Sequence, residues 1–188
     1  MYMTLKMVGE NTVVINKQKY RFLPYSAEYP SMFLKERNKI TKSLGKNITI
    51  EHVGSTSIPG LGGKGIIDIA IKTPRKKINQ YIRGLEKLGY RTDPEHLRDG
   101  RRIYLKKIVR YRGKESRVHI HLTLNDGYWN TYIVFREYLK KHSKELEKYA
   151  QIKKEAVNYA KGEGKKYREY KDKFLNNMMK KALKMKLD

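Results

Sequence analysis

A glycine- and serine-rich segment at residues 54–65 contains the first groups in the chain that could do chemistry. It reads GSTSIPGLGGKG and holds five of the 14 glycines. Glycine lets backbone N–H groups approach a phosphate closely, and hydroxyl and ammonium groups add further donors. The candidate phosphate ligands are Gly54, Ser55, Thr56 and Lys64. The spacing matches neither a Walker loop nor a dinucleotide fingerprint, so a tight connection that binds no ligand is the alternative.

Asp68 is the second candidate, because it interrupts the apolar run Gly-Ile-Ile-Asp-Ile-Ala-Ile. A buried carboxylate is costly unless it is paired or binds a cation. Strand alternation places Asp68 and Ala70 on one face and the isoleucines on the other. An acid on a strand that follows a phosphate loop favours phosphoryl or nucleotidyl transfer assisted by Mg²⁺. The alternative is an aspartate at the rim of a sheet.

His119 and His121 form the third group of candidates. They are two residues apart, so on a strand both side chains point to the same side. Imidazoles in this arrangement can act as a base, hold a phosphate or ligate a metal, although two histidines alone do not define a metal site. The alternative is an ordinary polar face of a half-exposed strand. Arg102, on the predicted partner strand, is a further candidate phosphate ligand.

Hydrophobic periodicity and turn residues predict the elements that position these groups. Residues 47–53 alternate as a strand, and residues 65–72 form the nearly unbroken apolar run of a central strand. One helix is predicted to start at the N-cap Ser26 and to end at Gly45. A second helix is predicted over residues 75–88.

Two hairpins and one loop complete the predicted first part of the chain. Residues 102–111 and 116–124 read as strands around a glycine-bearing connection, which predicts an antiparallel hairpin. Residues 12–15 and 20–23 predict a smaller hairpin. Turn residues predict a loop at residues 94–100.

The chain is predicted to be helical beyond residue 127, with Gly162 and Gly164 separating the last two helices. The expected architecture is an α+β fold, with a mixed or antiparallel sheet and helices packed on one of its faces. Residues 1–128 would form an α/β core. Residues 129–188 would form a helical region packed on the same unit.

Charge is the strongest compositional feature, with 43 Lys and Arg against 19 Asp and Glu and a formal net charge of +24. A field of this sign attracts phosphate-bearing molecules, so a nucleotide, RNA or another polyanion is the expected partner. A thermally adapted lysine-rich surface is the alternative, but such surfaces usually carry matching glutamate.

Several classes of protein are excluded by composition. The chain has no cysteine, which excludes disulfides, thiolate metal sites and a cysteine nucleophile. No stretch approaches eighteen apolar residues, and the first ten residues lack the apolar segment of a secretory signal. The sequence therefore predicts no membrane span and a cytoplasmic location.

Taken together, these segments resemble the GrpB family of the nucleotidyltransferase superfamily. The most specific similarity is EHVGSTSIPGL at residues 51–61, completed by Lys64 and the strand around Asp68. The histidine-x-histidine strand and the helical residues 135–139 and 149–153 also resemble the family. The similarity covers about residues 20–183, with Tyr29 where the family usually has tryptophan.

The resemblance implies a site that binds NTP and Mg²⁺. In the superfamily a glycine-serine turn binds the triphosphate, and two aspartates separated by one residue hold two Mg²⁺ ions together with a later third acid. Gly54 and Ser55 match the turn and Asp68 the first acid, but Ala70 stands in place of the second. Glu51, on the preceding strand, is the candidate that could compensate as a metal ligand.

Two hypotheses of different classes follow. The first is an enzyme that binds NTP and Mg²⁺ and transfers a nucleotidyl group to an unknown acceptor, with His119 or His121 as base or phosphate ligand. The second is a catalytically inactive basic scaffold that keeps the fold and binds RNA or another polyanion. Ala70 and the +24 charge favour the second hypothesis, whereas the segment at residues 54–65 and Asp68 favour the first.

Overall fold

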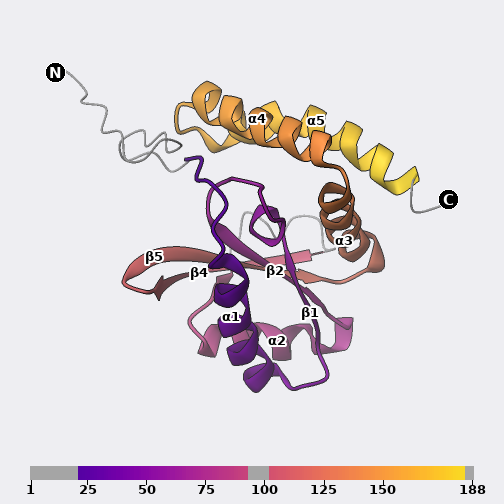
Figure 1. Cartoon of the computed structure of the whole chain (residues 1–188). Coiled ribbons are helices and arrows are strands. Elements are labelled where there is room, and N and C mark those ends of the chain that lie inside the picture. Colours follow the sequence, from indigo (N-terminus) through magenta and orange to yellow (C-terminus); the bar gives the residue numbers. More distant parts are fainter. Residues whose placement is uncertain (1–20, 93–101, 185–188) are drawn as a thin grey trace.

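A five-stranded mixed sheet forms the centre of the computed structural model, which describes residues 21–92 and 102–184 (Figure 1). The order across the sheet is β1-β2-β5-β4-β3, with β2 and β5 parallel and the other neighbours antiparallel. The strands are β1 (Thr49–Val53), β2 (Ile66–Lys72), β3 (Arg91–Thr92), β4 (Arg102–Tyr111) and β5 (Lys114–Thr123). The predicted strands of this region are confirmed, and the two-residue β3 is an addition.

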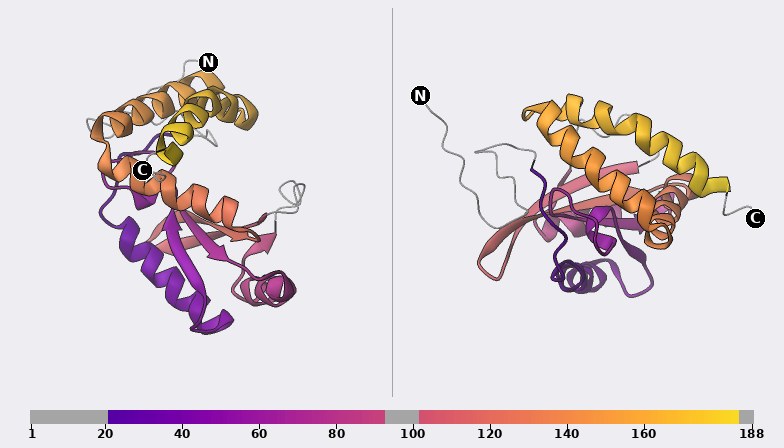
Figure 2. Two further views of the ribbon diagram at one scale, coloured as in Figure 1. Left: turned by 90° about the vertical axis from the view of Figure 1, so that its right-hand side faces the viewer. Right: turned by 45° about the horizontal axis from the view of Figure 1, so that its top comes forward.

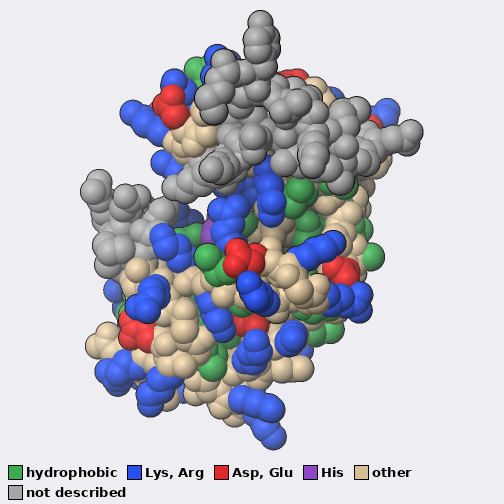
Figure 3. All heavy atoms as spheres, turned by 90° about the vertical axis from the view of Figure 1, so that its left-hand side faces the viewer, with side chains coloured by type: hydrophobic (Ala, Val, Ile, Leu, Met, Phe, Trp, Pro, Cys, Tyr) green, Lys and Arg blue, Asp and Glu red, His purple; other side chains and the backbone are tan. Residues whose placement is uncertain are grey.

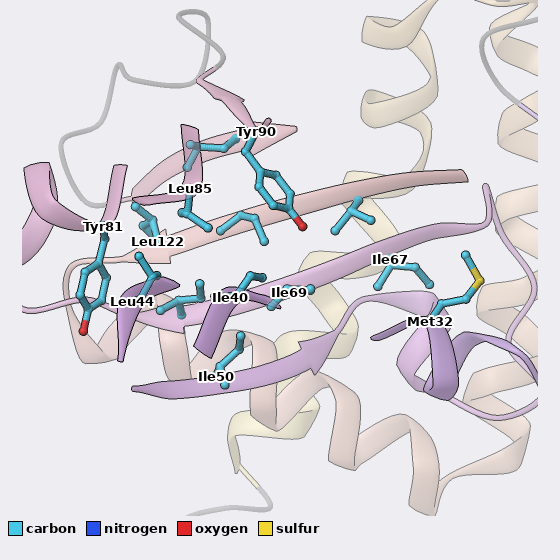
Figure 4. Close-up of a cluster of buried hydrophobic side chains, with 14 of the residues drawn as sticks. Met32, Ile40, Leu44, Ile50, Ile67, Ile69, Tyr81, Leu85, Tyr90 and Leu122 are labelled. Atoms are coloured by element: carbon cyan, nitrogen blue, oxygen red, sulfur yellow. The ribbon is translucent and has the colours of Figure 1, made fainter. Parts of the chain in front are cut away.

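One face of the sheet is apolar and is covered by two helices. These are α1 (Tyr29–Leu44) and α2 (Ile78–Lys87), the latter preceded by the 3-10 turn η2 (Arg75–Lys77). Ile67, Ile69 and Ile71 of β2 point into this core, as alternation predicts, and each is 0% exposed. Figure 4 shows how the two helices and the sheet share the core through Met32, Ile40, Leu44, Ile50, Ile67, Ile69, Tyr81, Leu85, Tyr90 and Leu122.

Three further helices lie on the opposite side of the sheet (Figure 2). α3 (Asp126–Lys141) packs against β1, β2 and β5, whereas α4 (Ser143–Ala160) and α5 (Gly164–Lys184) pack on each other and on the glycine-rich segment. Ile58 and Leu61 of that segment are buried among these helices. The prediction of helices on one face is therefore wrong. The first two helices cover the apolar face of the sheet, and the apolar stripes of the last three helices pack on its opposite side.

Element ends differ from the prediction in two places. α1 begins at Tyr29 rather than after Ser26, with Glu28 in the N-cap position, and Ser26 Oγ accepts a hydrogen bond from the Glu28 N–H at 3.2 Å. The β4–β5 turn contains only Arg112 and Gly113, whose φ angles of 47° and 77° suit a tight hairpin. Gly45, at φ 104°, ends α1 as predicted.

Some predictions concern residues outside the described ranges. They include the loop at residues 94–100 and most of the hairpin at residues 12–23, of which residues 21–23 are described and Leu23 forms an isolated bridge with Gly63. The proposed division after residue 128 falls inside α3 and stays a prediction. Among the described residues, no helix has the length and apolar character needed to cross a membrane.

Candidate functional site

Asp68 lies on the polar face of β2, where the sheet meets the glycine-rich segment. It is in register with Val53 of β1 and His119 of β5, and its side chain is 23% exposed. Gly54 has φ 69° and ψ −171°, and a Cβ at this position would overlap Asp68 Oδ2. Only glycine therefore lets the carboxylate lie against this turn.

The structure brings both predicted histidines to Asp68. Nδ1 of His119 lies 3.5 Å, and Nε2 of His121 3.2 Å, from Asp68 Oδ1. Burial disfavours the charged carboxylate, but hydrogen bonds from His119 and His121 outweigh burial and hold the pKa of Asp68 well below its usual range. Asp68 is thus an anion at neutral pH and accepts hydrogen bonds from the ring nitrogens that face it.

A chain of hydrogen bonds fixes the proton of His121. Arg102 Nη1 donates to the Tyr132 hydroxyl at 2.9 Å, so the hydroxyl uses its own proton to donate to His121 Nδ1 at 3.1 Å. The neutral ring therefore carries its proton on Nε2 and donates it to Asp68. Tyr132, on α3, was not predicted as a site residue. Arg102 also lies 5.3 Å from the ring centroid of Tyr128, so the structure places it beside two tyrosines.

Thr56 is buried beneath the segment rather than exposed to a ligand. Its hydroxyl donates to the Ile66 carbonyl at 2.9 Å and therefore accepts from His52 Nε2 at 3.0 Å. His52 also stacks on Phe33 with a centroid distance of 4.8 Å. Burial is the largest cause that lowers the pKa of His52 to about 4. The Thr56 hydroxyl thus ties the segment to the start of β2.

Three lysines from three elements converge on the glycine-rich segment. Lys153 of α4 is 4% exposed and donates a hydrogen bond to the Gly62 carbonyl. The Nζ atoms of Lys64 and of Lys171 on α5 lie 4.8 Å and 4.7 Å from the ring centroid of Tyr167. A Cβ at Gly63 would overlap both Lys153 Nζ and, at 2.7 Å, Ser55 Oγ. Lys64, Lys153 and Lys171 are called the lysine cluster below.

The lysines of the cluster repel one another. Burial, followed by repulsion from Lys171, lowers the pKa of Lys64 to about 8. The same two causes, in the same order, place the pKa of Lys153 well below its usual range. Burial also lowers the pKa of Lys171. An anion bound among these groups would relieve the repulsion and restore their charge.

Sequence reasoning missed Lys153 and Lys171, although both carry a signal. Lys153 is four residues after Tyr149 and three before Ala156, so it interrupts the apolar stripe of α4. Lys171 stands at the same spacing between Tyr167 and Phe174 of α5. A lysine on the buried stripe of a helix indicates a local need for positive charge.

Glu51, the second predicted metal ligand, is held by a different partner. Its Oε2 accepts from Arg136 Nη1 of α3 at 2.8 Å, and Arg136 also donates to the His52 carbonyl at 2.7 Å and to Glu137. In the register of the sheet Glu51 is opposite Ala70. To bind a metal on Asp68, Glu51 would have to leave Arg136.

Comparison with known proteins shows to which family the chain belongs. The sequence profile of the family described as GrpB protein matches residues 19–181. The chain belongs to the GrpB family. The expected family is thus confirmed.

Relatives in the GrpB family extend over most of the chain. The crystal structure of the conserved protein GrpB from Enterococcus faecalis is 27% identical, with a TM-score of 0.76 over 89% of this chain and 99% of that one. A UPF0157 protein of Halalkalibacterium halodurans is 29% identical over 85% of this chain and 80% of its own length. The glutamate-rich protein GrpB of Alkalihalophilus pseudofirmus is 25% identical over 88% and 97%.

The donor atoms in this GrpB-family chain fit one nucleotide-borne Mg²⁺ better than two metal ions. Asp68 offers a single ionised carboxylate, and Glu51 is bound to Arg136. Within residues 21–92 and 102–184, no group of three or more His, Cys, Asp and Glu is arranged to hold a metal ion. Mg²⁺ is often bound by one or two carboxylates together with substrate phosphates, and Asp68 can supply one such ligand.

Proposed function

We propose that the protein binds an NTP with Mg²⁺ and transfers its nucleotidyl group to an acceptor. The proposal rests on one observation: an ionised carboxylate, Asp68, lies beside a glycine-rich segment on which three buried or half-buried lysines converge. Lysines suit phosphate oxygens and the carboxylate suits the cation. We also propose a cytoplasmic location. A chain without cysteine forms no disulfides, and disulfides are rare in cytosolic proteins.

The triphosphate would lie along the glycine-rich segment. Gly54 and Ser55 supply a glycine turn and a hydroxyl, and the lysine cluster supplies positive charge from the segment, α4 and α5. When bound, Mg²⁺ would neutralise phosphate charge, with Asp68 as its protein ligand. Thr56 and Arg102 support this site indirectly. Thr56 accepts a hydrogen bond from His52, and Arg102 donates one to Tyr132.

His119 is the base in this proposal. Nδ1 of His119 faces the ionised Asp68 and carries the ring proton, so Nε2 of the neutral ring keeps a lone pair. His121 is held in place because Tyr132 and Asp68 engage both of its nitrogens. The acceptor oxygen attacks the α-phosphorus, its proton passes to His119 Nε2, and the bond from the α-phosphorus to the bridging oxygen breaks to release pyrophosphate.

Calorimetry with Mg²⁺ and each NTP tests the proposal. Asp68→Asn keeps the shape but removes the charge, and we expect it to weaken NTP·Mg²⁺ binding by about tenfold or more. Asp126→Asn is the matched control, because Asp126 is 68% exposed and paired with Lys72 at the far end of β2. Equal heats for the two variants would count against the proposal.

A polyanion-binding scaffold without transfer activity is the second candidate function. The ion pair of Glu51 with Arg136 favours it, because that pair removes the carboxylate that could replace the missing second acid. A salt titration with single-stranded RNA separates the two candidates. Binding that weakens steeply with salt but is unchanged in Asp68→Asn, with no NTP binding, would favour the scaffold.

A further inference from the structure

A pocket lies next to the lysine cluster, at the end of the sheet where β2 begins. Its volume is about 260 Å³, and its lining residues are Arg21, Lys64, Gly65, Ile108, Glu115, Ser116 and Arg117. Pockets that enclose a drug-sized ligand usually measure roughly 300–1,000 Å³. This pocket therefore suits one charged group of a larger molecule rather than a whole nucleotide.

Positive charge dominates the pocket. Three cations and one carboxylate line it, and the carboxylate, Glu115, is opposite Arg110 in the β4–β5 register. Repulsion from Arg117 and Arg168 contributes to the lowered pKa of Lys64, after burial and Lys171. In the described part of the chain, no carboxylate forms an ion pair with Arg117. Figure 3 shows lysine and arginine side chains crowding this side of the molecule.

Another pocket of similar size lacks this excess of charge. It measures about 280 Å³ and contains His52, Arg136 and Lys140. Arg136 is already paired with Glu51 and Glu137, and Lys140 lies 3.5 Å from Glu137. Its cations are thus balanced within the protein, whereas Arg117 has no carboxylate partner among the described residues.

Arg117 is placed to act together with the Asp68 centre. It precedes His119 by two residues on β5, so both side chains leave the same face about 7 Å apart. In the sheet Arg117 is in register with Ile66, and His119 with Asp68. A molecule with a hydroxyl beside His119 could therefore place a second group in the pocket.

We propose that this pocket binds a phosphate group of the acceptor, so that the acceptor is a phosphorylated hydroxyl compound. The inference rests on the proposed nucleotidyl transfer at Asp68. The planar guanidinium of Arg117 can hold two phosphate oxygens at once, and Lys64 lies between the two anion sites. The phosphate could belong to a free nucleotide or to the end of a nucleic-acid strand, because both offer the same group.

Calorimetry on the full chain, saturated with Mg²⁺ and a nonhydrolysable ATP analogue, tests this inference. The probes are AMP and adenosine, which differ only in the phosphate, and a short single-stranded oligonucleotide with and without a 5′-phosphate. The variants are Arg117→Gln and Arg117→Lys. Arg91→Gln is the matched control, because Arg91 is an exposed arginine on the edge strand β3, outside the pocket.

We expect AMP to bind about tenfold tighter than adenosine, and Arg117→Gln to remove that difference while Arg117→Lys keeps part of it. Arg91→Gln should leave the difference unchanged. If the phosphate strengthens binding only of the oligonucleotide, the acceptor is the end of a strand. If the phosphate of AMP strengthens binding by the same factor, the acceptor is a free nucleotide. Equal binding with and without the phosphate in both probe pairs, or equal effects of Arg117→Gln and Arg91→Gln, would overturn the inference.

The same titrations separate this pocket from the proposed function. Ser55→Ala should weaken binding of the ATP analogue, whereas the affinity for AMP should still depend on Arg117. If the analogue does not bind the wild-type protein but AMP still depends on Arg117 and not on Ser55, the nucleotidyl-transfer proposal is wrong and the phosphate site stands.

Discussion

At the scale of single residues, groups that can only donate or only accept hydrogen bonds determine where protons lie around Asp68. An arginine cannot accept a hydrogen bond, so Arg102 forces Tyr132 to donate to His121. An ionised carboxylate cannot donate, so both histidines present N–H groups to Asp68. One imidazole nitrogen of His119 then remains as an acceptor, and for this reason the proposed mechanism assigns the base to His119 rather than to His121.

Gly54→Ala should be among the most destabilising substitutions in the glycine-rich segment. The φ of 69° with ψ −171° is strained for alanine, at a cost of about 1–3 kcal/mol, and the overlap of its Cβ with Asp68 adds about 1–3 kcal/mol. Gly60→Ala is the control, because Gly60 has φ 81° but its nearest atom lies 4.0 Å from the added Cβ. Urea unfolding measures both, and an equal loss in the two variants would contradict the contact with Asp68.

His52 should make stability depend on pH below neutrality. Its pKa falls from 6.5 to about 4, so the unfolded chain binds a proton at a higher pH than the folded chain. The contribution of about 3 kcal/mol is present above pH 6.5 and is lost as pH falls toward 4. His52→Gln keeps a donor for Thr56 but does not titrate. Between these pH values the free energy of unfolding in urea should fall less steeply for the variant than for the wild type. Equal slopes of stability against pH would disprove the role of His52.

At the scale of elements, the sequence predicted what depends on local periodicity and missed what depends on packing across the fold. Alternation around Asp68 correctly separated the isoleucines from the acid, and the two-residue spacing correctly placed both histidines on one side. Tyr132 could not be found in this way, because its role depends on how α3 crosses the sheet. The same holds for Glu51, whose partner Arg136 is 85 residues away in sequence.

Helices α4 and α5 were predicted as a packed extension, yet they supply two of the three lysines around the segment. Apolar stripes alone explain why they fold onto Ile58 and Leu61. They do not explain why a lysine stands within each stripe. The helical region thus completes the candidate site as well as the fold, because Lys153 reaches the Gly62 carbonyl from α4.

Nucleotide binding should therefore take up protons. A triphosphate beside Lys64 and Lys153 would raise pKa values that are lowered in the free protein, to about 8 for Lys64 and well below normal for Lys153. Calorimetry near pH 8 in two buffers of different ionisation enthalpy measures this uptake. Lys153→Met should reduce both uptake and affinity.

Stability distinguishes this role of Lys153 from a merely structural one. Lys153→Met removes a desolvated amine that Lys171 repels but leaves the Gly62 carbonyl without its donor, so the free energy of unfolding should fall by no more than about 1–3 kcal/mol. If Lys153→Met is less stable but takes up as many protons on nucleotide binding as the wild type, Lys153 is not part of the anion site.

At the scale of the whole molecule, the net charge of +24 sets two separate effects on stability. Repulsion among the positive charges destabilises the compact state, and any salt weakens this repulsion by screening. A bound anion adds a second effect, which depends on the affinity of one site for that particular anion. A comparison of chloride and pyrophosphate at equal ionic strength separates the two.

Pyrophosphate should raise the Tm more than chloride does, because it can bind at the lysine cluster. At 100 times its Kd a bound ligand adds about 2.7 kcal/mol, which corresponds to roughly 5–10 °C for a chain of this size. Lys171→Gln should remove most of the excess, because Lys171 is half-buried against Tyr167. Lys173→Gln is the control, since Lys173 is exposed on the same helix and removes the same charge. An equal loss of the excess in both variants would mean that pyrophosphate acts on the overall charge, and the lysine cluster would then be no specific anion site.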